Sequence, residues 1–301
     1  MYLQGKKSKF RIFIIVLLSS ISSGIADYVK TIDHIIIVGN AQDSSIVNFL
    51  ADVVQERRQE FVTFFNGGLA AKITIHLAES ETSFFRLAAT QIPDWSGAVA
   101  FPEQRKILLK PGSFFNPDGY RETILHELAH MYIADNFSSR DIPLWLIEGC
   151  AMHLSKSTLS WNEMIILGNA FAREQVTGLE AIDGLLQFGS VRARLAYLEA
   201  FSAVRFLVED QGNEIFRAVM GDFSREKNID QNFVKHLGIT LSEFEDEWYL
   251  SMKERYKWVM FLQVENLIWI SLVLISIAAF IIVKIRNRRI VRKWRETDDL
   301  I

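Results

Sequence analysis

Residues 126–130 read His-Glu-Leu-Ala-His, and residues 143–149 read Pro-Leu-Trp-Leu-Ile-Glu-Gly. Side chains four positions apart lie on one face of an α-helix, so His126 and His130 can both point toward one metal ion. Imidazole nitrogen is a preferred zinc ligand, and a catalytic zinc keeps one position open for water. Glu127 lies beside that open position and can accept a proton from the water. The alternative is an amphipathic helix that carries two surface histidines.

Glu148 is an acidic residue in an otherwise apolar helix start. An ionised carboxylate in apolar surroundings needs a partner, and a metal ion would supply one. The alternative is an acidic residue near a helix N-terminus, where the helix dipole stabilises negative charge. Because the histidine pair lies a short distance upstream, we predict that His126, His130 and Glu148 together bind one zinc ion.

Helical patterns surround these two stretches. A capping side chain or a proline marks the start of each predicted helix. The predictions are a helix over residues 117–135 capped by Asn116, a helix through Glu148 that is capped by Asp141, and a helix from Ser190 to Gly212. Further helices are expected between residues 213 and 258.

The residues before Pro111 favour strands. Residues 34–38 form a short apolar run that is typical of a buried strand, and residues 71–78 alternate between apolar and polar side chains. The other expected elements are strands over residues 96–101 and 105–110, and a helix from Ser44 or Ser45 to about Phe65. The pattern predicts an α+β fold, with a small sheet-containing N-terminal lobe and a helical C-terminal lobe.

The histidine motif and the downstream helix resemble the gluzincin metallopeptidases. In that family His-Glu-x-x-His is followed by a short connection and then by a helix that bears Trp-Leu-x-Glu-Gly. The chain is most similar to the bacterial peptidase MA-like group, over about Thr31 to Tyr256. The resemblance implies a gluzincin-like fold, one zinc ion and hydrolysis of peptide bonds, with Glu127 as the catalytic base.

The resemblance also implies roles outside the metal ligands. It implies that residues 97–101 form an edge strand that pairs with the substrate backbone. It further implies that Tyr197, on a later helix, donates a hydrogen bond to the oxyanion, and such donors lower the barrier to acyl transfer. The alternative for Tyr197 is a core residue that packs the helical lobe. His153 is a second candidate donor, and its alternative is a core or solvent-facing histidine.

One position departs from the family pattern. Thermolysin-like members carry an acidic residue four positions after the third ligand, where it orients a zinc-binding histidine. Met152 occupies that position here. We therefore expect the orienting group to be a backbone carbonyl or Asp135.

The first 26 residues have the three-part order of a secretory signal peptide. Lys6, Lys7 and Lys9 precede an apolar run over residues 12–18, and small residues follow. We predict cleavage after Ala26, because Gly24-Ile25-Ala26 has the small residues that signal peptidases require. An uncleaved anchor helix is the alternative, although the apolar run is short for a membrane span.

A second apolar stretch lies near the C-terminus. Residues 265–283 are predicted to form a transmembrane helix, since no charge occurs between Leu267 and Val283. Positive charge collects on the cytoplasmic side of membranes, which predicts that the basic tail, residues 284–301, is cytoplasmic. A buried core helix followed by a basic tail is the alternative. The basic residues of the tail are Lys284, Arg286, Arg288, Arg289, Arg292, Lys293 and Arg295.

Composition narrows the class of function. The chain has 301 residues and a formal net charge of −3, so nucleic acid is not an expected partner. Cys150 is the only cysteine, which excludes an intrachain disulfide and a zinc site built on several cysteines. We expect Cys150 to be a small buried apolar residue on a helix.

These observations predict a single-pass protein of the bacterial cell membrane. Its catalytic domain, residues 27–258, would lie in the periplasm or outside the cell and hydrolyse a peptide or protein substrate near the membrane. One alternative is a non-catalytic, zinc-binding receptor or assembly factor with a peptidase-like fold. A purely structural zinc site has four protein ligands and needs no general base, so Glu127 speaks against it. Another alternative is a peptidase that cleaves only itself or one partner.

Overall fold

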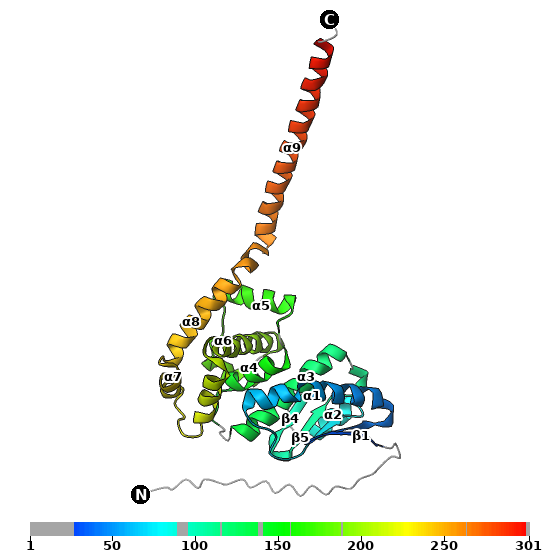
Figure 1. The fold of residues 1–301 in the computed structure, drawn as a ribbon, viewed down its shortest axis with the longest axis vertical. Coiled ribbons are helices and arrows are strands. Elements are labelled where there is room, and N and C mark those ends of the chain that lie inside the picture. The colour runs from blue at the N-terminus through cyan, green and yellow to red at the C-terminus, as the bar shows by residue number, and fades with distance from the viewer. Residues whose placement is uncertain are drawn as a thin grey trace, which may run out of the picture.

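A computed structural model describes residues 27–88, 96–114, 116–137, 141–156, 158–187, 189–262 and 264–298. The predicted signal peptide lies outside the described residues. The helices and strands form one chain with a sheet-containing part first and a helical part second (Figure 1). This arrangement confirms the predicted α+β fold class.

Five strands make one mixed sheet, in the spatial order β1-β2-β3-β5-β4. The pairs β2–β3 and β3–β5 are parallel, whereas β1–β2 and β4–β5 are antiparallel. The position of β4 at one edge agrees with the predicted edge strand over residues 97–101. The strands are β1 (Asp27–Ile32), β2 (Ile35–Asn40), β3 (Ile73–Leu77), β4 (Ala98–Phe101) and β5 (Lys106–Leu109).

Helices account for most of the remaining described residues. The longer ones are α1 (Ser44–Phe65), α2 (Glu81–Ala88), α3 (Pro117–Asn136), α4 (Leu144–Ser155), α5 (Trp161–Ala172), α6 (Ser190–Asp222), α7 (Ile229–Leu237), α8 (Leu241–Arg255) and α9 (Val264–Asp298). Short 3-10 helices are η1 (Ala41–Asp43), η2 (Pro102–Gln104), η3 (Gly112–Phe114), η4 (Glu180–Gln187) and η5 (Lys257–Leu262).

The two faces of the sheet are covered by different helices. Side chains alternate between the faces of a strand, so Ile107 and Leu109 of β5 belong to the main core, which includes α1 and α3. Leu108, between them, belongs instead to a small cluster with Phe84 and Ala88 of α2. The sheet therefore separates α2 from the helices that carry the predicted zinc ligands.

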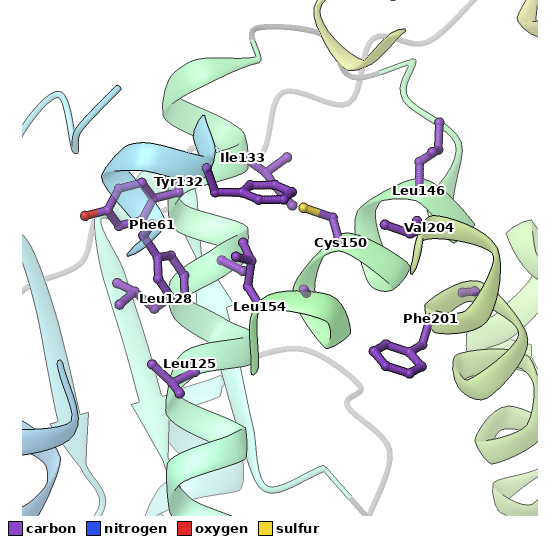
Figure 2. Close-up of a cluster of buried hydrophobic side chains, with 14 of the residues drawn as sticks. Phe61, Leu125, Leu128, Tyr132, Ile133, Leu146, Cys150, Leu154, Phe201 and Val204 are labelled. Atoms are coloured by element: carbon purple, nitrogen blue, oxygen red, sulfur yellow. The ribbon is translucent and has the colours of Figure 1, made fainter. Parts of the chain in front are cut away.

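The packing of α3, α4 and α6 sets the position of those ligands. Leu128 of α3, Cys150 of α4 and Val204 of α6 are fully buried within the main core, and Figure 2 shows them in one apolar cluster. Cys150 is unpaired and buried, as predicted. Gly149 permits this packing, because a Cβ added there would lie 2.3 Å from the backbone oxygen of Ala200 on α6.

Two helix boundaries differ from the sequence-based expectations. Helix α4 begins after Pro143, and Asp141 forms an ion pair at 2.6 Å with Lys227 instead of capping the helix. Helix α6 starts after Gly189 and continues to Asp222. Its backbone breaks at Gly212, the predicted end, where φ is 82° and ψ is 166°. Glycine tolerates positive φ, and the chain resumes a helical path beyond it.

The C-terminal helix α9 extends away from the rest of the molecule (Figure 1). Its segment Ile268–Ile290 is long and apolar enough to cross a membrane, and none of that segment's most apolar stretch is buried. This span contains most of the predicted one. Before it, Val259 of η5 is buried against α5, where a Cβ added to Gly168 would lie 2.6 Å from Val259 Cγ2. The packed part of the chain therefore continues past residue 258.

Candidate metal centre

Helix α3 places its two histidines on the side that faces α4. Leu125, Leu128 and Ala129 of α3 are buried in the core, whereas the side chains of His126 and His130 remain 19% and 18% exposed. The four-residue spacing brings the two Nε2 atoms to 3.1 Å from each other. One turn of helix thus directs two imidazole nitrogens to one point, as the sequence predicted.

Glu148 of α4 completes the cluster. Its Oε2 atom lies 3.2 Å from Nε2 of His126 and 3.7 Å from Nε2 of His130. One possible ligand atom from each of the three residues lies within 4.8 Å of the others, so the cluster could hold a metal ion. The helix packing described above therefore brings together the three residues that the sequence pattern singled out.

The donor set fits a zinc ion. Two ligand nitrogens at about 2.0–2.1 Å from one tetrahedral ion are about 3.3 Å apart, close to the observed 3.1 Å between His126 and His130. The Oε2 atom of Glu148 is buried, and no donor from the described part of the chain meets it in hydrogen-bond geometry despite the proximity of His126. An unsatisfied buried carboxylate oxygen is costly, and a cation among these atoms would satisfy it.

The protonation states of His130 and Glu148 also suit a metal. Burial lowers the pKa of His130 to about 4, which leaves its ring neutral and able to offer a lone pair. Burial raises the pKa of Glu148, but the neighbouring His130 and His126 lower it by more, so the carboxyl group is ionised at neutral pH. Neutral imidazole and ionised carboxylate are the forms that bind zinc.

Glu127 lies in the wall of a cavity of about 450 Å³ next to the cluster. Burial raises the pKa of Glu127 to about 7, although His126 and a hydrogen bond with the backbone of Ala100 act in the opposite direction. A carboxyl group with a pKa near the working pH can both accept and donate a proton. The contact with Ala100 also places Glu127 beside the edge strand β4.

Tyr197 of α6 lines the same cavity. Its ring lies 6.3 Å from the ring of His126, centroid to centroid, in an edge-on arrangement. Burial raises the pKa of Tyr197, so the phenol keeps its proton at neutral pH and can act as a donor. The structure therefore brings Tyr197 close to the cluster of His126, His130 and Glu148.

The other candidates lie elsewhere. His153 is not part of the cavity wall, and its ring packs 5.7 Å from that of Phe64. Asp135 pairs with Arg105 at 2.5 Å and accepts a hydrogen bond from the backbone of Ala70, so it is not the expected orienting group. Met152 lines the cavity, at the position where thermolysin-like members carry an acidic residue.

Comparison with known proteins bears on this geometry. A family model described as the Peptidase MA superfamily matches residues 66–254, which is more than half of the chain. The chain belongs to the Peptidase MA superfamily. This confirms the resemblance inferred from the histidine motif, and membership indicates a peptidase. A search of curated proteins gives no match.

The superfamily match begins after α1 and ends within α8, so it contains all of α3, α4 and α6. Sequence reasoning missed a group of charged side chains in the cavity wall of this superfamily member. They come from four different helices or helix ends, and two of them lie at a helical spacing from a predicted site residue: Glu122 is four residues before His126, and Arg194 is three residues before Tyr197. The missed residues are Glu122, Lys156, Glu163 and Arg194.

Proposed function

We propose that this superfamily member is a membrane-anchored, zinc-dependent peptidase that acts outside the cytoplasm. The observation that carries the proposal is the convergence of His126, His130 and Glu148 beside a cavity with Glu127 in its wall. A zinc ion held by these three residues would polarise the peptide carbonyl and lower the pKa of water.

The residues of the chain then have distinct tasks. Glu127 accepts a proton from the attacking water and returns it to the leaving amine, a role suited to its raised pKa. Tyr197 donates a hydrogen bond from its hydroxyl group to the carbonyl oxygen as negative charge develops there. Strand β4 lies at an edge of the sheet, where an extended peptide can pair with its outer side and be aligned across the cavity.

The proposed location follows from the two ends of the chain. The apolar segment Ile268–Ile290 supports a single membrane span. Lys284, Arg286 and the other basic residues of the tail favour a cytoplasmic C-terminus, and the signal-like residues 1–26 favour export of the domain between them. The proposed substrate is therefore a peptide or protein close to the outward-facing surface of the cytoplasmic membrane.

The experiment uses the full chain in lipid nanodiscs, supplied with zinc and a mixed peptide library. Mass spectrometry of the products measures cleavage, and elemental analysis measures bound zinc. We expect Glu127→Gln to lower cleavage by about 10²- to 10⁴-fold with its zinc retained. We expect Glu148→Gln to lose both zinc and cleavage, because a neutral amide is a poor zinc ligand.

Glu214→Gln is the matched control, since Glu214 is exposed on α6 and remote in sequence from the site. It should retain zinc and cleavage. Cleavage that persists in Glu127→Gln would contradict the assigned role of Glu127. A folded, zinc-loaded chain that cleaves no peptide would instead favour the non-catalytic zinc-binding receptor.

A further inference from the structure

The cavity beside the metal ligands carries charges of both signs. Its wall includes charged residues from α3, from the C-terminal end of α4, from α5 and from α6. These are Glu122, Glu127, Lys156, Glu163 and Arg194. Glu127 already has a role in the proposed reaction, so the question is what the other four do.

Three of them satisfy one another. Lys156 Nζ lies 2.8 Å from Glu163 and 3.2 Å from Glu122, and the Lys156 side chain is only 10% exposed. Glu163 is held further by a capping box with Ser160 at the start of α5. This network links α3, the end of α4 and α5. The charge of Lys156 is neutralised by the two carboxylates, so Lys156 is a poor binding site for an anionic ligand.

Arg194 is different. Its side chain is exposed, lines the cavity, and forms no ion pair with any of the residues that the structure describes. Arg194 lies three residues before Tyr197 on α6, so the two side chains share one face of the helix. Their Cα atoms are separated by about 4.5 Å along the helix axis.

We propose that Arg194 binds a carboxylate of the substrate within one or two residues of the bond that is cleaved. This inference rests on the proposed function, because it concerns the same cavity. Residues of an extended peptide are spaced by about 3.3–3.6 Å, so the step from Tyr197 to Arg194 corresponds to between one and two residues of the substrate. A guanidinium group binds carboxylates through two parallel hydrogen bonds, which makes it selective for them.

Two sources can supply the carboxylate. It is either the side chain of an acidic residue or the free C-terminus of a short peptide. Charge-assisted hydrogen bonds of this kind favour the charged ligand over its neutral isostere by about 10- to 100-fold. The inferred substrates are therefore acidic near the cleavage site, or end there.

The test measures binding separately from cleavage. The full chain with Glu127→Gln, in nanodiscs with zinc, is immobilised and offered N-acetylated hexapeptide pairs that differ only by Asp or Asn at one scanned position. Each pair is offered both as C-terminal amide and as free acid. Mass spectrometry gives the ratio of retained Asp to Asn peptide, and of free acid to amide.

We expect one position, or the C-terminus, to show a ratio of about 10 to 100. Adding Arg194→Gln should bring this ratio close to one, while Arg194→Lys should keep part of it. Arg192→Gln is the control, since it removes the same charge two residues earlier from a residue outside the cavity wall. It should leave the ratio unchanged.

Ratios near one at every position, ratios that Arg194→Gln does not alter, or retention of no peptide at all would each overturn the inference. Cleavage of the same peptides by the chain with Glu127 intact is measured in parallel. Cleavage without any preference for carboxylates refutes the role of Arg194 and leaves the peptidase standing. Selective retention without cleavage supports Arg194 and argues against the proposed catalysis.

Discussion

The proposed role of Tyr197 can be tested with Tyr197→Phe, which removes only the hydroxyl oxygen. If its hydroxyl group stabilises the developing oxyanion, Tyr197→Phe should lower kcat by about 10²- to 10³-fold, with KM and bound zinc nearly unchanged. Steady-state kinetics on a cleaved library peptide measures this. Tyr249→Phe is the control, because it removes a hydroxyl that donates to the backbone of Phe171 in the same lobe. A full kcat in Tyr197→Phe would favour the alternative of a core tyrosine.

At the scale of residues, the sequence predicts which side chains share one helix face, but not which side chains the packing of different helices brings together. His126 and His130 could be predicted as a pair because four residues make one turn of any helix. Glu148 was predicted from its apolar surroundings and the histidine pair upstream, but its distance of 3.2 Å from His126 depends on how α4 crosses α3. Arg194 lies at a helical spacing from Tyr197 and so had a local signal, whereas the place of Lys156 in the cavity wall depends on how the end of α4 packs against α3 and α5.

Helix α4 depends on one glycine for its position. In Gly149→Ala the new methyl group would lie 2.3 Å from the Ala200 oxygen and 2.5 Å from Val204 Cγ2, so α4 and α6 must move apart. We expect a loss of about 1–3 kcal/mol in the free energy of unfolding, as for other overpacked cores. Zinc affinity should also fall, because Glu148 moves with α4. Denaturant unfolding and zinc titration measure the two effects.

Gly221→Ala is the matched control for this substitution. Gly221 also lies in a helix, but the nearest atom to its added Cβ is 4.0 Å away. Stability should therefore be unchanged or rise by up to about 1 kcal/mol, because alanine favours a helix more than glycine does. If both variants were equally stable, the close approach of α4 and α6 at Gly149 would not control the position of Glu148.

At the scale of elements, periodicity located the strands and the helices but not their connections. Alternating side chains identified β3 within two residues at each end, and the apolar run 34–38 identified β2. The strand order could not be predicted, because it depends on parallel pairs between β2, β3 and β5 that are distant in sequence. The prediction that Asp141 caps α4 was wrong, since the carboxylate of Asp141 forms an ion pair with Lys227.

At the scale of the whole molecule, a buried acid makes stability depend on pH. Glu199 of α6 is fully buried, and this burial raises its pKa to about 7 from the ordinary 4.5, despite hydrogen bonds from Thr177. The folded chain therefore binds this proton more tightly than the unfolded chain, so the contribution of Glu199 to stability falls as pH rises from about 4.5 to 7.

Glu199→Gln should remove this dependence, because the amide is neutral at all pH values and its oxygen can still accept from Thr177. The variant should become more stable than the parent as pH rises, by up to about 3 kcal/mol at pH 8. Urea unfolding of both full chains in mild detergent, from pH 5 to pH 8, measures the difference. A constant difference across this range would show that Glu199 titrates normally.

The orientation of the chain in the membrane can be tested with its cysteine content. Cys150 is the only cysteine, it is fully buried, and burial raises the pKa of its thiol, so it should not react with a maleimide. Single cysteines can therefore be introduced as reporters without background labelling. Glu214→Cys places one on the exposed surface of α6, and Thr297→Cys places one beyond the apolar segment Ile268–Ile290.

A membrane-impermeant maleimide applied to cells with a permeable outer envelope should label the cysteine at position 214 directly. The cysteine at position 297 should react only after the membrane is opened with detergent, because the basic residues that precede it favour the cytoplasmic side. The unsubstituted chain should stay unlabelled until it is denatured. Labelling of both reporters in intact membranes would mean that α9 does not span the bilayer, and labelling of position 297 alone would reverse the orientation. In either case the substrate would have to be sought in another compartment, while the chemistry argued from the metal centre would be unaffected.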